Sequence, residues 1–194
     1  AGLDGESEYL GDIMAEVDRL EGRLKEMLQF VRPAGPERLP LDVNESVRDT
    51  LRLVAGNARA AGVTVEAELQ PSLPRILGNA MLLEQVLLSL VGNAVEATPA
   101  GGTVVVRTGL QRGDGEPCVV VEVRDAGSGI LPEHLPRIFE PFYTTKSKGT
   151  GLGLAIAKKF AEAQGGSLGV RSRRGETVFA VHLPALPEDE PCRP

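Results

Sequence analysis

Residues 1–33 alternate apolar and polar positions at the spacing of a helix with one apolar side. Apolar residues recur at steps of three and four, with charged residues between them. This seam consists of Leu3, Leu10, Ile13, Val17, Leu20, Leu24, Met27 and Val31. A single helix cannot bury such a seam within itself, so the pattern predicts a coiled-coil-like stalk helix that pairs with another helix through residues 10–31. The alternative is a helix that lies along its own domain.

The pattern changes after a proline-containing break. Pro33 and Pro36 stop the helix, because proline cannot continue its hydrogen-bond ladder. Further along, strand and helix periods mix without internal repeats, which is typical of an α+β domain. We therefore expect a stalk helix over 1–33, a linker over 34–38, a folded domain over 39–184, and a disordered tail over 185–194 that is rich in proline and acidic residues.

Within the domain, the periods and the turn residues between them predict an ordered series of elements. A short strand at 39–43 comes first, followed by a helix that runs to Ala60 with Asn44 as its N-cap. The other elements expected are a strand at 63–69, a helix at 79–97, strands at 103–111 and 117–125, a helix at 150–164, and strands at 167–172 and 177–183.

Composition narrows the class of protein. The 194 residues are 42% apolar, enough for a packed core, and the net charge of −6 with a pI near 5.1 argues against nucleic-acid binding. Cys118 and Cys192 have neither metal-ligand nor disulfide spacing, which fits a reducing cytoplasm. With no unbroken apolar run of 18 residues and no signal-peptide pattern, we expect no membrane contact in this fragment and a cytoplasmic location, either alone or as the soluble end of a membrane-bound parent.

The helix expected at 79–97 has a polar stripe beside its apolar face. Ser89, Asn93 and Glu96 follow each other at helical spacing, so they share one side. The amide oxygen of Asn93 is a neutral, hard donor of the kind that Mg²⁺ accepts beside phosphate oxygens and waters. A solvated helix residue is the alternative.

An acidic residue followed by two glycines ends the strand expected at 117–125. Asp125 precedes Gly127 and Gly129, which allow the backbone to approach another group closely. The carboxylate can accept a hydrogen bond from an exocyclic amine such as that of adenine. On its own, this pattern also fits a simple turn that contains an aspartate.

A third segment, KSKGTGLGL at 146–154, comes directly before a predicted helix. Glycines at a helix start expose backbone N–H groups, and with Lys146 and Lys148 they form a site for a polyphosphate. The segment lacks the GxxxxGK[ST] of a P-loop, and Leu154 stands where the dinucleotide-binding pattern needs a third glycine.

Together, in order and spacing, these segments resemble the histidine kinase branch of the ATPases that include gyrase, the Hsp90 chaperones and MutL. The matching motifs are the N box at 84–97, the G1 box at 125–130, the F box at 138–146, the G2 box at 149–154 and a closing strand motif at 175–179. The first helix also resembles the second helix of the family's dimerisation and phosphoacceptor stalk.

The resemblance implies a Bergerat fold: a two-layer α/β sandwich with three helices on one face of a mixed sheet, and ATP and Mg²⁺ as cofactors. It implies that Asn93 holds the metal, Asp125 reads the adenine amine, and Thr177 supports Asp125 from the next strand. The implied nucleotide-binding residues are Asn93, Asp125, Gly127, Gly129, Ile130, Lys146, Lys148, Gly149, Thr150, Gly151, Leu152, Gly153, Leu154 and Thr177.

A flexible lid is implied over about 130–150. In the family it closes over the nucleotide, with Phe139 and Phe142 packing it shut here and Lys146 or Lys148 near the phosphates. Plain core packing is the alternative role for the two phenylalanines.

Two positions depart from the family pattern. Ser89 stands where most of these kinases have a second asparagine and where hydrolysing relatives have a glutamate, so activation of water by this residue is poorly supported. His134 and His182, the only histidines, do not match the phosphoacceptor motif. The acceptor is therefore expected on a stalk helix missing from this fragment or on another protein, and no side chain of the chain is assigned as catalytic.

The function implied is phosphoryl transfer from Mg·ATP to a histidine outside the fragment, for relay to a response regulator. The expected partners are a histidine-bearing stalk helix of the same or a sister chain, the response regulator, and a second copy of the chain. A serine or threonine kinase of the same fold and a nucleotide-sensing scaffold without transfer are the alternatives.

Overall fold

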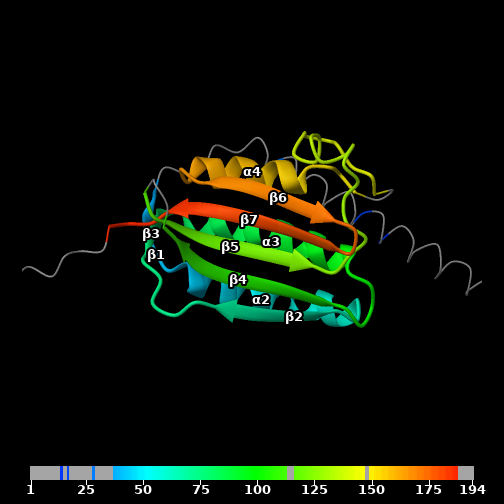
Figure 1. Cartoon of the computed structure of the whole chain (residues 1–194), viewed down its shortest axis with the longest axis horizontal. Helices are drawn as coiled ribbons and strands as arrows, with labels where there is room; N and C mark the ends of the chain where they lie inside the picture. Colours follow the sequence, from blue (N-terminus) through cyan, green and yellow to red (C-terminus); the bar gives the residue numbers. More distant parts are fainter. Residues whose placement is uncertain are drawn as a thin grey trace, which may run out of the picture.

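In the computed structural model, a five-stranded mixed sheet forms one layer of the domain (Figure 1). The structure describes residues 14, 17, 28, 37–112, 116–146 and 149–187. The strands are β2 (Thr64–Leu69), β4 (Thr103–Gln111), β5 (Cys118–Asp125), β6 (Ser167–Arg173) and β7 (Glu176–Pro184). Their order is β2-β4-β5-β7-β6, in which β2 is parallel to β4 and the other neighbours are antiparallel.

Three helices form the second layer, and Figure 1 shows them together behind the sheet. They are α2 (Val43–Ala60), α3 (Ala80–Ala97) and α4 (Gly153–Ala163). Among the described residues, the opposite face of the sheet carries no helix. The α+β class and the two-layer sandwich predicted from the resemblance are thus confirmed.

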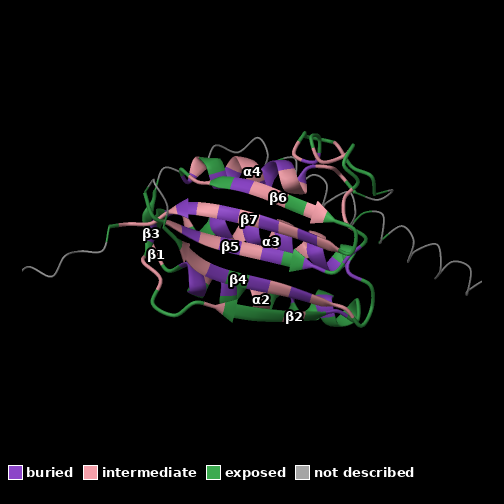
Figure 2. Ribbon diagram, in the orientation of Figure 1, coloured by how far each residue is buried: buried purple, intermediate pink, exposed green. Residues whose placement is uncertain are grey.

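The core lies between these two layers, where Figure 2 shows alternating buried positions along the central strands. Alternate residues of a strand point to opposite faces, so one set meets the helices and the other meets solvent. The central helix α3 buries one side completely, with Leu83, Val86, Leu87, Leu90, Val91, Ala94 and Val95. Among the described residues, α3 is the one helix long and apolar enough to cross a membrane. The burial of its apolar side against the sheet makes it the core helix of the domain.

The start of α2 corrects one prediction. Asp42, rather than Asn44, is the N-cap, and its carboxylate accepts from the backbone N–H of Asn44 at 2.8 Å. The Asn44 side chain is instead buried, where it donates to the Gln70 carbonyl and accepts from the Thr108 hydroxyl at 2.6 Å. Because the cap lies two residues earlier than predicted, the first strand, β1 (Leu39–Leu41), also ends sooner than expected.

A small second sheet was missed by the sequence analysis. β1 pairs with β3 (Ile76–Gly78), a strand too short to show a period. Ala185 forms a bridge to Ile76, and the Leu186 N–H donates to the Arg75 carbonyl at 2.7 Å. The prediction of a disordered tail from 185 is therefore wrong for its first residues, and residues 188–194 lie outside the described part.

Most of the predicted stalk also lies outside the described residues. Met14, Val17 and Leu28 are helical and exposed, and Val17 belongs to the predicted seam. The pairing of this helix through residues 10–31 stays a prediction. The other predicted elements of the domain lie within a few residues of the observed ones, with the largest shift at α4, which begins at Gly153 instead of 150.

Candidate functional site

A pocket of about 550 Å³ lies between α3, the loop after β5, the segment 130–146 and the start of α4. Eleven predicted site residues line it: Asn93, Asp125, Gly129, Ile130, Lys146, Gly149, Thr150, Gly151, Gly153, Leu154 and Thr177. Gly127 lies beside it in the loop, and Leu152 is buried in the core. Lys148 lies outside the described residues. Segments far apart in the sequence therefore meet at one site.

Asp125 is the most buried charge of the pocket, with 3% of its surface exposed at the end of β5. Its Oδ1 accepts a hydrogen bond from the Gly127 N–H at 2.9 Å. Burial raises the pKa of the Asp125 carboxyl, and this effect is opposed by the Gly127 hydrogen bond and by the charge of Lys146. A Cβ at Gly127 would lie 2.7 Å from the Ala97 carbonyl oxygen, so the loop after Asp125 packs against the end of α3 too closely for a side chain.

The polar side of α3 faces the same pocket. Asn93 Oδ1 accepts from Lys146 Nζ at 2.9 Å, and Glu96 Oε2 lies 2.5 Å from the same ammonium. A Cβ at Gly153 would lie 3.9 Å from both the Asn93 amide and the Ser89 hydroxyl. Of the predicted stripe, Ser89 and Asn93 thus lie beside the beginning of α4, and Glu96 lies beside Lys146.

The beginning of α4 has the features of an anion site. Its N-cap residue, Leu152, makes no side-chain capping hydrogen bond, and Gly153 and Leu154 line the pocket. The first N–H groups of a helix lack partners within it and carry partial positive charge. Gly151 has φ +70° and its carbonyl accepts from the Phe142 N–H at 2.9 Å, and a Cβ there would lie 2.5 Å from the Phe142 backbone, so glycine is needed at this turn.

The two lid phenylalanines differ. Phe139 packs edge-on against Phe179 of β7, with ring centroids 6.4 Å apart. Phe142 is 63% exposed, so of the two phenylalanines only Phe139 packs against the core, next to the buried Ile138. His134 is half-buried, lines the pocket and contacts the Tyr143 hydroxyl through Nδ1 at 2.6 Å.

Thr177 stands opposite Asp125 in the β5–β7 register, and its hydroxyl lies 3.0 Å from that of Ser172. Ser172 Oγ also accepts from the Ile130 N–H at 2.8 Å and contacts the Glu176 carbonyl at 3.3 Å. One hydroxyl therefore connects β6, β7 and the entry to the lid. The sequence analysis missed Ser172, because only the three-dimensional pairing brings it to Ile130.

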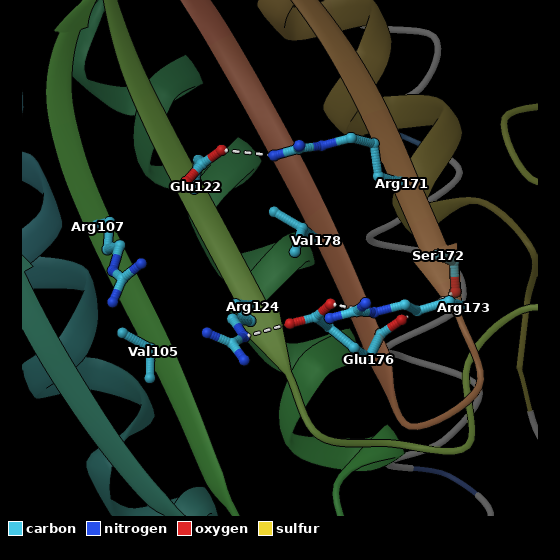
Figure 3. Close-up of a pocket in the computed structure, with 9 residues that line it drawn as sticks. All are labelled: Val105, Arg107, Glu122, Arg124, Arg171, Ser172, Arg173, Glu176 and Val178. Atoms are coloured by element: carbon cyan, nitrogen blue, oxygen red, sulfur yellow. Dashed lines mark hydrogen bonds and ion pairs between the residues drawn. The ribbon is translucent and has the colours of Figure 1, made fainter.

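A second hollow, of about 430 Å³, lies on the uncovered face of the sheet. Figure 3 shows its charged side chains pairing across strands: Arg171 with Glu122, and both Arg124 and Arg173 with Glu176. The hydrogen bond from Arg173 is the largest cause of the lowered pKa of Glu176, which burial opposes and Arg124 reinforces. Each of the four arginines that line the hollow thus has a carboxylate partner, Arg107 pairing with Glu68, although the lining, with two glutamates, stays net positive.

The match to known proteins agrees with this geometry. Residues 78–187, more than half of the chain, match the histidine kinase-, DNA gyrase B- and HSP90-like ATPases. The chain belongs to this family. The sensor histidine kinase ZraS of Klebsiella oxytoca is 39% identical to it over 183 residues, which are 93% of this chain and 39% of ZraS.

Two solved structures have a similar fold. Full-length ShkA in complex with AMPPNP matches with a TM-score of 0.79 at 29% identity, over 94% of this chain and 40% of ShkA. Histidine kinase ThkA in complex with the response regulator protein TrrA matches with a TM-score of 0.75 at 29% identity, over 94% of this chain and 52% of that one. The predicted relation to sensor histidine kinases is confirmed, and the chain spans about two fifths of the length of the first curated relatives it matches.

Proposed function

We propose that the pocket binds Mg·ATP and that the domain transfers the γ-phosphoryl group to a histidine on a stalk helix outside this chain. The observation that carries the proposal is a buried carboxylate, Asp125, in one pocket with the uncapped start of α4. The carboxylate suits the amine of a nucleotide base, and the start of α4 suits the phosphates. The ShkA complex with AMPPNP supports a nucleotide as the ligand.

The base of the nucleotide is assigned to the Asp125 end of the pocket. An ionised carboxylate accepts a hydrogen bond from the adenine amine but repels the carbonyl oxygen that guanine presents there. The Gly127 N–H donates to one carboxylate oxygen, and Gly129 and Ile130, which follow in the same loop, also line the pocket. ATP is therefore expected to bind more tightly than GTP.

The residues present fit a magnesium ion that is held mainly by phosphates. Asn93 offers an amide oxygen that already contacts a cation, the Lys146 ammonium, at 2.9 Å. The described residues contain no cluster of three or more His, Cys, Asp or Glu that could hold a metal by itself. Mg²⁺ commonly binds through one or two protein oxygens plus substrate phosphates and waters, and it would neutralise the charge of the triphosphate.

For the transfer, this chain contributes positioning and charge stabilisation. The N–H groups at the start of α4 and the Lys146 ammonium are the groups proposed to hold the phosphates in line with the incoming histidine. A neutral imidazole nitrogen attacks the γ-phosphorus, the bond to the β-phosphate oxygen breaks, and ADP leaves. An unperturbed imidazole has a pKa of about 6.5, so much of it is already nucleophilic at neutral pH.

The partners follow from the same proposal. The ThkA complex with TrrA supports a response regulator as the next acceptor. The seam over residues 10–31 is proposed to pair with a second copy, because several large apolar side chains would otherwise stay in water. Sedimentation over a range of concentrations tests this pairing, and a strict monomer at high concentration would contradict it.

The decisive experiment mixes the chain with ATP radiolabelled at the γ-phosphate and a stalk domain that carries an acceptor histidine. We expect acid-labile, alkali-stable label on the stalk domain, and no label when that histidine is replaced by glutamine. Tight ATP binding without any transfer would favour the nucleotide-sensing scaffold. Acid-stable label on serine or threonine would favour the other kinase class.

A further inference from the structure

Lys146 lies at the point where the lid meets α3, between two side chains of different chemistry. Its ammonium contacts the Asn93 amide oxygen at 2.9 Å and the Glu96 carboxylate at 2.5 Å. The two partners are three residues apart on α3, so they are neighbours on one side of the helix. A lid residue is thereby attached to the helix that carries the proposed metal ligand.

We infer that Lys146 is exchanged between two positions: Glu96 and Asn93 hold it in the nucleotide-free protein, and the phosphates take it when Mg·ATP binds. Glu96 is then a positioning residue that sets nucleotide affinity through Lys146. This inference rests on the proposed function, because it takes the triphosphate as the ligand of the pocket.

Electrostatics makes the two positions of Lys146 exclusive. A metal ion and an ammonium on the same amide oxygen would repel each other at short range. Once Mg²⁺ takes Asn93, the ammonium loses one of its two partners, and the phosphates offer it several negative oxygens instead. Glu96 loses its ion-pair partner in this exchange, and the loss of that ion pair is the cost that Glu96 adds to nucleotide binding.

The ion pair is weak enough for such an exchange. The side chains of Lys146 and Glu96 are 44% and 65% exposed, and ion pairs this exposed contribute little because solvent screens them. The pair thus biases the position of the lysine without locking it. The expected effect on affinity is accordingly a few-fold.

The chain offers a matched control. Lys158 and Glu162 on α4 form an ion pair of similar exposure, 44% and 56%, and neither residue lines the pocket. The replacement Glu162→Gln removes the same charge from the domain as Glu96→Gln. It tests whether any change of affinity arises from net charge alone.

The test is a double-mutant cycle measured by calorimetric titration of ATP, with and without Mg²⁺, on the wild type, Glu96→Gln, Lys146→Met and the double variant. We expect Glu96→Gln to tighten ATP binding about two- to fivefold, the range that an exposed ion pair allows. In the Lys146→Met background the gain should largely disappear, and Glu162→Gln should change nothing.

Equal gains from Glu96→Gln in both backgrounds would overturn the inference, since Glu96 would then act on the phosphates directly. Weaker binding by Glu96→Gln would overturn it as well. If the wild type binds no ATP at all, the proposed function fails. If ATP binds but the cycle shows no coupling, only the inference on Glu96 fails.

Discussion

The two hollows of this domain use the same two strands in opposite ways. On β5, Asp125 is buried toward the candidate nucleotide pocket, while its neighbour Arg124 faces the open side of the sheet. On β7, Thr177 belongs to the pocket and Glu176 to the hollow on the open face. Neighbouring residues of a strand point to opposite faces, so one strand supplies both sites.

The difference lies in how each site treats charge. On the open face, Glu176 is shared by Arg124 and Arg173, and its pKa is lowered. In the pocket, Asp125 has a backbone N–H as its partner, and burial raises its pKa. Paired surface charges are satisfied without a ligand, whereas a buried carboxylate among glycines is suited to a partner from outside. The following predictions compare these two sites, from the largest expected effect on ATP affinity to the smallest.

The largest effect is expected for Asn93→Ala. Because Asn93 is the proposed protein ligand of the metal, we expect the gain in ATP affinity on adding Mg²⁺ to vanish while the thermal midpoint stays near that of the wild type. The matched control is Asn57→Ala on the exposed side of α2. Calorimetric titration with and without Mg²⁺ measures both, and an unchanged magnesium effect in Asn93→Ala would remove this residue from the site.

A smaller loss is expected for Asp125→Asn. A hydrogen bond to a charged group contributes about 1.5–3 kcal/mol, so ATP affinity should fall by roughly ten- to a hundredfold. Glu122→Gln, three residues earlier on the same strand, changes a carboxylate that faces Arg171 on the open side and should leave ATP affinity unchanged. Equal effects of the two variants would mean that net charge, and not the pocket, decides binding.

Acidification should separate the two sites by the sign of their pKa shifts. Asp125, with a raised pKa, becomes neutral as the pH falls through that value, so ATP affinity should start to drop at a higher pH than an ordinary aspartate allows. Ionisation of the buried Asp125 carboxyl also lowers the stability of the fold, and this destabilisation disappears as the pH falls through the same pKa. Glu176 behaves oppositely, because its pKa is lowered in the folded state. Its ionised carboxylate stabilises the fold above the unfolded-state pKa, and this contribution is lost as the pH falls through the lower folded-state pKa. The ratio of wild-type to Asp125→Asn affinity against pH isolates the first effect, and a flat ratio would contradict it.

Ser172→Ala should have a few-fold effect. It removes the acceptor of the Ile130 N–H at the entry to the lid, and a neutral hydrogen bond contributes about 1 kcal/mol, or roughly fivefold in affinity. Ser172→Thr keeps the hydroxyl and should retain part of the ATP affinity that Ser172→Ala loses. The control is Ser167→Ala, at the exposed start of β6. Faster hydrogen exchange of the Ile130 amide in Ser172→Ala would locate the change, and unchanged exchange would argue against this contact.

The smallest effect is expected on the open face. Arg171→Gln and Arg173→Gln remove exposed partners of Glu122 and Glu176, and neither residue lines the nucleotide pocket. ATP affinity should stay within error of the wild type, since exposed ion pairs are screened by solvent. A clear loss of affinity in either variant would show that the two hollows are coupled through β6 and β7.

The sequence by itself determined the regular elements and the motif residues of this protein. Apolar periods mark α3 and the β4–β5 pair, because burying one side of an element is a local property of its pattern. The family resemblance carried by Asn93, Asp125 and the glycines at 149–153 predicted that they form one site, and in the structure all of them line the same pocket.

Only the tertiary structure decided which polar partners meet. Asn44 looked like a cap but is buried against Thr108, and Ser172 reaches Ile130 across 42 positions of the chain. The contact of Lys146 with Asn93 and Glu96 likewise depends on how the lid lies on α3. Hydrogen bonds and ion pairs between distant residues leave no periodic pattern, because they depend on the packing of whole elements rather than on neighbours along the chain.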